Sequence, residues 1–296
     1  MQQSGTECEF CSSDSWVILS PIEQSIKRKI EAVGTPLKDW DIQINYGIKT
    51  GYNDAFIIDT AKRDEILANC QSEDERERTA ELIRPILRGR DIKRYGYNWA
   101  GLYLIATFPS RHYDIEQYPA VKEYLLSFGI ERLEQTGKEH NVNGEKIKAR
   151  KKTSNKWFET QDSISYWEDF SKPKIVFQEI VQESQFFYDM DGRFICNDTC
   201  RIIVGKELSF LLGVLNSKLF FYAIKHFYGG GVLGEHGIRM KHTFFQNFPC
   251  IQYNSTIDKL VKELTEKKNA KVENQIGNKI YNLYGLTPQE IQMVEE

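Results

Sequence analysis

Basic side chains interleaved with aromatic residues and glycines are the feature of this sequence best suited to binding a ligand. They gather in three windows, 82–98, 138–156 and 225–241. The first window holds five basic residues and one acidic residue, and the second holds seven and two. Arginine pairs with guanine edges and phosphates, and lysine neutralises phosphates. A single basic run usually marks a solvated surface, but three runs, two of them beside glycine turns, favour a face that binds nucleic acid.

The sequence lacks the motifs of several common catalytic centres. It contains no Asn-Pro-Pro-Tyr loop for amino methylation, no Gly-x-x-x-x-Gly-Lys phosphate loop, no Gly-x-Ser-x-Gly elbow and no His-Glu-x-x-His pair. The glycines between 229 and 237 follow a predicted helix instead of a strand. That is the wrong context for a dinucleotide or S-adenosylmethionine cradle, so we predict no catalytic residue in this chain.

Two cysteine pairs have spacings that zinc sites can use, Cys8 with Cys11 and Cys196 with Cys200. The first pair lies in a polar lead-in, and the second pair continues a strand-like stretch. Free thiols or half-buried core cysteines are therefore the favoured interpretation. No metal site is predicted.

Length and composition exclude several classes of protein. The 296 residues are 41% hydrophobic and 27% charged, which is typical of a globular chain and not of a disordered tail or a fibre. The net charge of −3 excludes a chain whose overall charge drives it onto nucleic acid. No apolar run reaches about 18 residues, so we expect no membrane partner. Six cysteines in so long a chain favour a reducing compartment, and we expect a cytoplasmic protein.

Hydrophobic periodicity predicts an α+β fold, with a mixed-sheet domain followed by a small helical C-terminal appendage. The expected domains are a linker and short helix at 1–35, a mixed-sheet domain at 36–253 and a helical docking element at 254–296. The predicted elements are a helix at 22–32, strands at 41–45, 55–58, 102–107 and 174–180, a hairpin of 186–188 with 193–196, one helical face over 208–226, and two amphipathic helices after 254.

Seven strings occur along the chain in one order: 40–59 (WDIQINYGIKTGYNDAFIID), 83–92 (IRPILRGRDI), 156–159 (KWFE), 173–175 (PKI), 187–189 (FYD), 212–219 (LGVLNSKL) and 280–287 (IYNLYGLT). Together they resemble the TaqI-like specificity domain. This is the target-recognition part of type IIG restriction-modification enzymes and related N6-adenine DNA methyltransferases. The resemblance extends from about residue 16 to residue 290.

The resemblance implies that the chain reads base sequence in double-stranded DNA and has no catalysis of its own. It implies a parent protein whose methyltransferase domain, absent from this chain, flips and methylates an adenine. That domain is the expected protein partner, and S-adenosylmethionine is expected there, with no cofactor in this chain. Whether the parent also cleaves DNA stays open.

Eight residues are the predicted DNA contacts. An amide can pair with adenine, and a lysine can pair with guanine or with phosphate. Turn chemistry is the competing interpretation at 49–53, because asparagine tolerates turn conformations. Tyr46, Phe56, Trp157 and Phe187 are expected in the core. The predicted contacts are Lys49, Thr50 and Asn53 in the first turn, Arg88, Arg90 and Arg94 in the arginine-rich window, and Arg239 and Lys241 beside the glycine loop.

Two other functions stay open at this point. One is an intact enzyme whose active site carries no recognisable motif. The other is a protein-interaction module that docks a methyltransferase or a phage-defence partner through its C-terminal helices. Binding that is lost on removal of 255–296 would favour the second.

Overall fold

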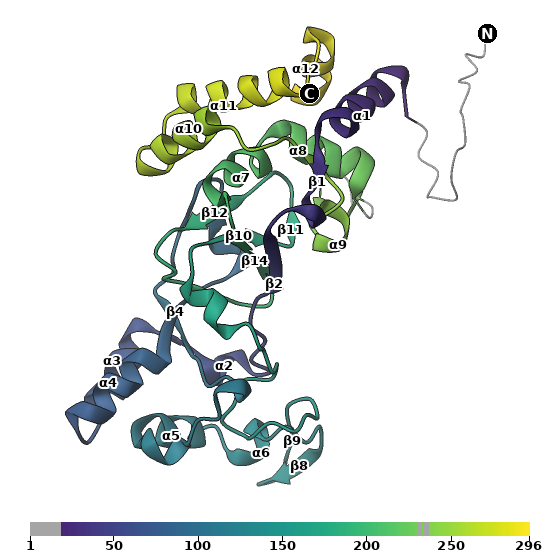
Figure 1. Cartoon of the computed structure of the whole chain (residues 1–296). Coiled ribbons are helices and arrows are strands. Elements are labelled where there is room, and N and C mark those ends of the chain that lie inside the picture. Colours follow the sequence, from purple (N-terminus) through teal and green to yellow (C-terminus); the bar gives the residue numbers. More distant parts are fainter. Residues whose placement is uncertain (1–18, 230–231, 234–236) are drawn as a thin grey trace. The chain divides into compact units, whose positions relative to one another are not determined.

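The computed structural model describes residues 19–229, 232–233 and 237–296 (Figure 1), so the Cys8–Cys11 pair lies outside it. Contacts divide the chain into two compact units. The first combines Met1–Ile42, Glu179–Phe186 and Gly205–Glu296. The second combines Gln43–Gln178 and Phe187–Val204. The predicted ranges 36–253 and 254–296 were drawn from changes in composition along the chain. In the structure, the helices after 254 pack in the same unit as the first helix.

The first unit is mainly helical. Ser20 caps the first helix through a capping box with Glu23, as the sequence Ser-Pro-Ile-Glu favours. The two predicted amphipathic helices after 254 are confirmed, and they pack along the helices of the 208–228 segment. The helices of this unit are α1 (Pro21–Val33), α7 (Leu208–Leu215), α8 (Lys218–Ala223), the π-helix η6 (Ile224–Tyr228), α9 (His242–Phe245), α10 (Ser255–Glu266), α11 (Ala270–Leu283) and α12 (Pro288–Glu295).

The predicted helical face over 208–226 is interrupted at Asn216 and Ser217. The Ser217 hydroxyl accepts from the Phe220 N–H and starts α8 as a new helix, bent by 63° from α7. The Asn216 amide donates to Phe186 O at 2.9 Å and accepts from Phe186 N at 3.0 Å. Among the described residues no single helix is long and apolar enough to cross a membrane; α7 and α8–η6 reach that length only as a bent pair.

Short strands complete the first unit. β16 pairs antiparallel with both of its neighbours, with Ile180 opposite Arg239 and Val232 opposite Ile238. A two-residue pairing of Thr35 with Cys250 joins the end of α1 to the segment before α10. The elements are β11 (Ile180–Val181), β15 (Val232–Leu233), β16 (Gly237–Arg239), β1 (Thr35–Pro36), β17 (Pro249–Cys250) and the 3-10 helix η1 (Leu37–Asp39).

Two four-stranded sheets form the frame of the second unit, one ordered β12-β10-β14-β2 and the other β13-β4-β7-β3. The second sheet is mixed, because β13 runs parallel to β4 while β7 is antiparallel to both β4 and β3. The expected mixed sheet of an α+β fold is therefore present. The strands are β2 (Ile42–Tyr46), β3 (Ile57–Asp59), β4 (Ile83–Leu87), β7 (Leu102–Ile105), β10 (Lys174–Gln178), β12 (Phe186–Asp189), β13 (Ile195–Cys196) and β14 (Cys200–Gly205).

The predicted hairpin of 186–188 with 193–196 is wrong. β12 and β13 belong to different sheets, because the chain between them turns around the Asp189 side chain. That carboxylate accepts from the N–H groups of Arg193 and Phe194 at 3.1 and 2.9 Å. The predicted strand at 55–58 is also shifted, since its first half closes the short helix α2 (Asn53–Phe56).

Helices and two small hairpins flank these sheets. The acidic 59–81 segment forms α3 and α4, which begin at the side-chain caps Asp59 and Ser72. The elements are α3 (Thr60–Ala68), α4 (Glu73–Leu82), α5 (Pro119–Leu126), α6 (Ile130–Leu133), the 3-10 helices η2 (Gly89–Asp91), η3 (Pro109–Arg111), η4 (Ile115–Gln117) and η5 (Trp167–Ser171), and the strand pairs β5 (Ile92–Lys93) with β6 (Gly96–Tyr97) and β8 (Glu139–Val142) with β9 (Glu145–Lys148).

The aromatic residues assigned to the core divide into two groups. Phe56 and Phe187 belong to the hydrophobic core of the second unit, and Trp157 packs half-buried against it. Tyr46 is 49% exposed, so its assignment to the core is wrong. The Arg201 guanidinium lies over the Tyr46 ring, 3.7 Å from its centroid, which gives this exposed ring a cation–π partner.

Candidate nucleic-acid interface

The turn between β2 and α2 presents two of the predicted contacts to solvent. Lys49 and Asn53 are exposed. Thr50 is only 1% exposed, and its hydroxyl donates to Asn53 Oδ1 at 2.7 Å while accepting from Tyr52 N. Thr50 therefore shapes the turn, and its burial removes it from the set of side chains that a DNA base could reach. Gly51 has a φ of +80°, which a residue with a Cβ adopts only under strain.

Arg150 fixes this turn from beneath. Its guanidinium is buried and donates to Thr50 O at 2.8 Å, and it binds three further carbonyls. Burial lowers the pKa of Arg150 to about 10, with the Glu159 charge opposing that change, so the group stays charged at neutral pH. The additional acceptors are Leu133 O at 2.7 Å, Glu159 O at 2.8 Å and Trp157 O at 2.6 Å.

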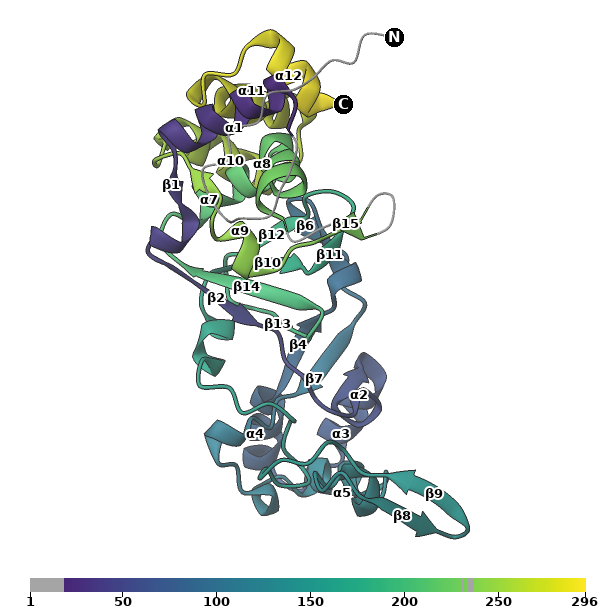
Figure 2. The same cartoon turned by 90° about the vertical axis from the view of Figure 1, so that its right-hand side faces the viewer.

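The β8–β9 hairpin projects from the rest of the second unit beside this turn (Figure 2). Asn143 and Gly144 form its tip, and both have positive φ values (51° and 87°), as a tight two-residue hairpin loop requires. Arg132 joins the hairpin to the turn: its Nη1 donates to Lys148 O at 3.1 Å, and its guanidinium lies 4.6 Å from the centroid of the Tyr52 ring.

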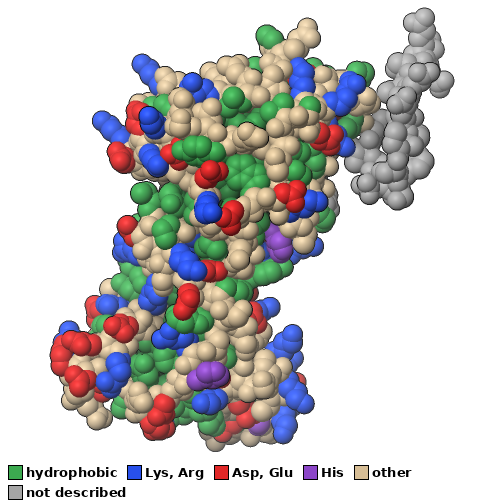
Figure 3. All heavy atoms as spheres, viewed as in Figure 1, with side chains coloured by type: hydrophobic (Ala, Val, Ile, Leu, Met, Phe, Trp, Pro, Cys, Tyr) green, Lys and Arg blue, Asp and Glu red, His purple; other side chains and the backbone are tan. Residues whose placement is uncertain are grey.

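Lysines dominate the surface of this hairpin and its flanks. Figure 3 shows Lys and Arg side chains gathered where the hairpin lies, at the lower right. None of the lysines in 138–156 has a carboxylate within ion-pair distance among the described residues. Surface lysines without carboxylate partners form a positively charged patch, which suits a polyanion such as a phosphate backbone. The exposed members of this hairpin patch are Lys138, Lys146, Lys148, Lys151, Lys152 and Lys156.

The three predicted arginines of the arginine-rich window, 82–98, differ in their exposure and in their partners. Arg88 is engaged, because its guanidinium donates twice to the buried Asp91 carboxylate, at 3.0 and 2.9 Å. This hydrogen bonding raises the pKa of Arg88. Arg90 is exposed, and Arg94 is half-buried with its guanidinium 5.4 Å from the centroid of the Tyr95 ring. Arg90 is therefore the member best placed to contact DNA.

One segment, 196–199, contacts both the first turn and the arginine window. Ile48 N donates to Cys196 O at 2.7 Å, and Asn197 N donates to Leu87 O at 3.0 Å. Gly89 N donates to Thr199 Oγ1 at 2.9 Å. The structure thus brings the first turn and the arginine-rich window to the same neighbouring segment within the second unit.

The remaining two predicted contacts lie in the first unit. Arg239 is exposed, but its Nε donates to Glu179 Oε1 at 2.8 Å, so part of its charge is compensated. Lys241 is half-buried, with its Nζ 5.9 Å from the Phe244 ring centroid. The glycines 230, 231 and 234 of the neighbouring loop lie outside the described residues.

A family model matches half of the chain. The model is that of the TaqI-like C-terminal specificity domain, and it matches residues 84–231. The chain belongs to this family. The match includes the five basic residues of the arginine-rich window, the hairpin patch and both helices of the bent pair.

Two solved structures share the fold of this specificity domain. The first is the type IIL restriction-modification enzyme MmeI in complex with DNA, at 14% identity and a TM-score of 0.54. The second is the type IIG restriction endonuclease BpuSI, at 12% identity and a TM-score of 0.53. The matches cover 88% and 93% of this chain, but only 35% of the MmeI chain and 31% of the BpuSI chain. This chain therefore spans about a third of the length of these two proteins.

The cysteines and the glycine loop that the sequence offered for metal or cofactor binding can be placed where the structure describes them. It contains no group of three His, Cys, Asp or Glu side chains placed to hold a metal ion. Cys196 and Cys200 are buried free thiols of β13 and β14, and burial raises the pKa of Cys200 well above its usual value. Gly229 follows a π-helix and Gly237 opens β16, so these described ends of the glycine loop do not join a strand to a helix.

Sequence reasoning identified the 138–156 window as basic but named none of its residues as contacts. The Asn143-Gly144 dipeptide is a strong hairpin signal that could have marked the projecting element. No local pattern identifies Arg150 as the residue that fixes the turn. Seven basic residues lie in this window, and the burial of Arg150 depends on carbonyl partners elsewhere in the chain.

Proposed function

We propose that this chain reads a base sequence in double-stranded DNA as the specificity portion of a restriction-modification N6-adenine DNA methyltransferase. The observation that carries the proposal is the attachment of the Lys49–Asn53 turn to the lysine-rich hairpin through Arg150 and Arg132. In this arrangement the lysines hold the phosphate backbone, and the exposed Lys49 and Asn53 side chains meet base edges. Membership of a specificity-domain family supports the same function.

The catalytic steps belong, in this proposal, to another part of a longer protein. The coverage of only 35% and 31% of MmeI and BpuSI supports a partner domain of this kind. That domain would hold S-adenosylmethionine and flip the target adenine. The specificity domain binds the duplex and orients it for that partner domain. We propose that it does so in the cytoplasm.

The test is selection of bound duplexes from a random-sequence library, at low salt and again with added salt. Enrichment of a short asymmetric motif by the full chain supports base reading. We expect Asn53→Ala to relax the motif at one or two positions with a cost of about 1–3 kcal/mol per lost base contact. Lys259→Gln on α10 is the matched control and should leave the motif intact. Salt-sensitive binding with no enriched motif would contradict the proposal.

The C-terminal helices are less suited to docking a partner than their sequence suggests. The apolar side chains of α10 and α11, including Ile257, Val261 and Ile276, are buried within the first unit. They pack against α7 and α8. These faces are therefore occupied inside the chain, and we do not propose partner docking through them.

A further inference from the structure

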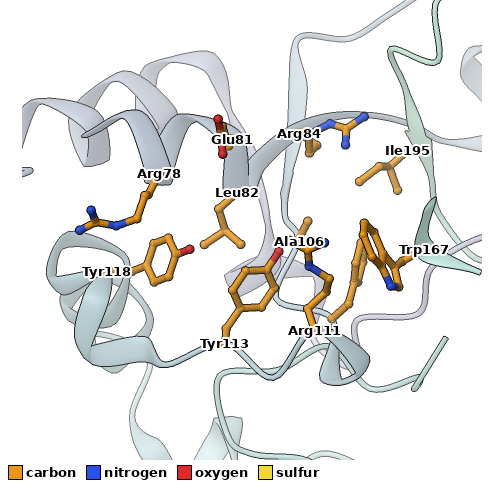
Figure 4. A pocket seen from close by; sticks show the side chains of 11 residues that line it. Arg78, Glu81, Leu82, Arg84, Ala106, Arg111, Tyr113, Tyr118, Trp167 and Ile195 are labelled. Carbon is orange, nitrogen blue, oxygen red and sulfur yellow. The ribbon is translucent and has the colours of Figure 1, made fainter. Parts of the chain in front are cut away.

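A pocket of about 360 Å³ lies in the second unit, apart from the turn and the hairpin patch. It is lined from α4, β4, the 106–118 segment, η5 and β13 (Figure 4). Its size falls in the range of small-molecule sites. The polar and aromatic members of its lining are Arg78, Glu81, Arg84, Arg111, Tyr113, Tyr118 and Trp167.

The lining of this pocket carries more positive than negative charge. The lining holds three arginines and one carboxylate, that of Glu81, and none of the three arginines has an ion-pair partner within the described part of the chain. Arg84 donates to Ser171 Oγ and Gly192 O, so two of its guanidinium hydrogen-bond donors are already engaged. Arg78 donates to Gln117 O through Nη2, while its Nε is buried without a hydrogen-bond partner among the described residues. Buried donors of this kind call for an acceptor.

The Arg111 guanidinium contacts two aromatic rings and has no side-chain acceptor among the described residues. Its guanidinium stacks on the Trp167 ring, 4.0 Å from the centroid, and lies 5.7 Å from the Tyr113 ring centroid. Figure 4 shows Arg111 between these two rings. Stacking uses the face of a guanidinium and leaves the in-plane N–H groups available for an anion.

Two of the arginines, Arg78 and Arg111, influence the ionisation of Tyr118 electrostatically. Burial raises the pKa of Tyr118, and the charges of Arg78 and Arg111 oppose that change. The Tyr113 and Tyr118 rings meet edge to face, with centroids 5.9 Å apart. Aromatic faces beside arginine donors match a ligand with a planar ring and an anionic group.

We propose that this pocket binds a single nucleotide, with its phosphate on the arginine donors and its base against the aromatic rings. Stacking of a base on aromatic side chains and charge-assisted hydrogen bonds from arginine to phosphate are both favourable. The nucleotide is either free or an unstacked residue of a DNA strand. This inference does not depend on the proposed duplex recognition, because the two sites use different residues.

The experiment is calorimetric titration of the full chain with 2′-deoxyadenosine 5′-monophosphate, 2′-deoxyadenosine, inorganic phosphate and a single-stranded tetranucleotide. We expect the monophosphate or the tetranucleotide to bind at least about tenfold more tightly than the nucleoside or phosphate, because only they engage both parts of the pocket. Arg111→Gln and Trp167→Leu should each weaken that binding about tenfold. Arg28→Gln on α1 is the control and should leave it unchanged.

The outcomes separate cleanly. Binding of the monophosphate without the tetranucleotide identifies a free nucleotide, and tighter binding of the tetranucleotide identifies a strand residue. Phosphate that binds as tightly as the monophosphate reduces the site to an anion site and overturns the proposal, as does the absence of any binding. Duplex binding by Arg111→Gln, measured in parallel with its melting temperature, distinguishes failure here from failure of duplex recognition.

Discussion

Lys174 Nζ lies 2.5 Å from Asp189 Oδ2, and both side chains are buried in the second unit. Lys174 also donates to Phe170 O at 2.8 Å. The Asp189 carboxylate accepts two backbone N–H groups of the turn that carries the chain from β12 to β13. This pair therefore connects β10, η5 and both four-stranded sheets.

Removing the lysine alone should be costly. We expect Lys174→Met to lower the free energy of unfolding by about 3–5 kcal/mol, because it leaves a buried carboxylate without its counter-charge. The double variant Lys174→Met with Asp189→Asn should recover part of the loss. Urea denaturation measures both, and a double variant no more stable than Lys174→Met would argue against this explanation.

The hairpin patch predicts a change in salt dependence. Lys146→Gln with Lys148→Gln should reduce the slope of log affinity against log salt concentration by about 0.9 for each phosphate contact removed. The matched control is Lys259→Gln with Lys271→Gln, on α10 and α11, which keeps the net charge of the test variant. Equal slopes for the two double variants in a fluorescence titration of duplex DNA would remove the hairpin from the interface.

Arg88 and Arg90 should behave differently although only one residue separates them. Arg90→Ala should weaken duplex binding by about 1–2 kcal/mol and leave stability unchanged, because its side chain is exposed. Arg88→Ala should lower the free energy of unfolding by about 1–3 kcal/mol, because Asp91 loses two hydrogen bonds. Denaturation and binding curves for both variants check this division; identical behaviour would contradict it.

Glu290 makes the stability of the first unit depend on pH in the acidic range. Burial opposes its ionisation, but hydrogen bonds from Lys29, Thr287 and Ser25 outweigh burial and lower its pKa to about 2. A carboxylate with a lowered folded-state pKa stabilises the fold above its ordinary pKa near 4.5, and this contribution is lost as the pH falls towards 2.

The variant Glu290→Gln should therefore be less stable than the unmodified chain at pH 6, by about 1–3 kcal/mol. The difference should shrink between pH 4.5 and pH 2, which denaturation at stepped pH can follow. A difference that stays constant over this interval would show that the Glu290 charge does not stabilise the fold.

The sequence predicted the helices best, because their patterns are local. Apolar spacing predicted α1, α10 and α11 correctly. The break at Asn216 was missed, because apolar residues keep a helical spacing on both sides of it and the partner of the Asn216 amide is the backbone of Phe186, 30 residues earlier.

Strand pairing and the state of each candidate side chain depended on contacts that no local pattern encodes. Two short strands around an Asp-Gly turn usually form a hairpin, but Asp189 binds the turn and sends β13 to a different sheet. Likewise, burial of Thr50 and the pairing of Arg88 with Asp91 follow from tertiary packing. A basic or polar residue in the sequence indicates which hydrogen bonds its side chain can form. It does not reveal whether these hydrogen bonds are already made within the folded protein.

The chain passes between its two compact units four times, at 42–43, 178–179, 186–187 and 204–205. Strand β10 comes from the first segment of the second unit, and its antiparallel neighbour β14 comes from the other, with Ile175 opposite Ile203. A chimera that takes only residues 43–178 from a relative would pair strands of different ancestry along this ladder. Transfer of binding preference between such proteins therefore requires both segments to move together, so the inheritable module is discontinuous in the gene.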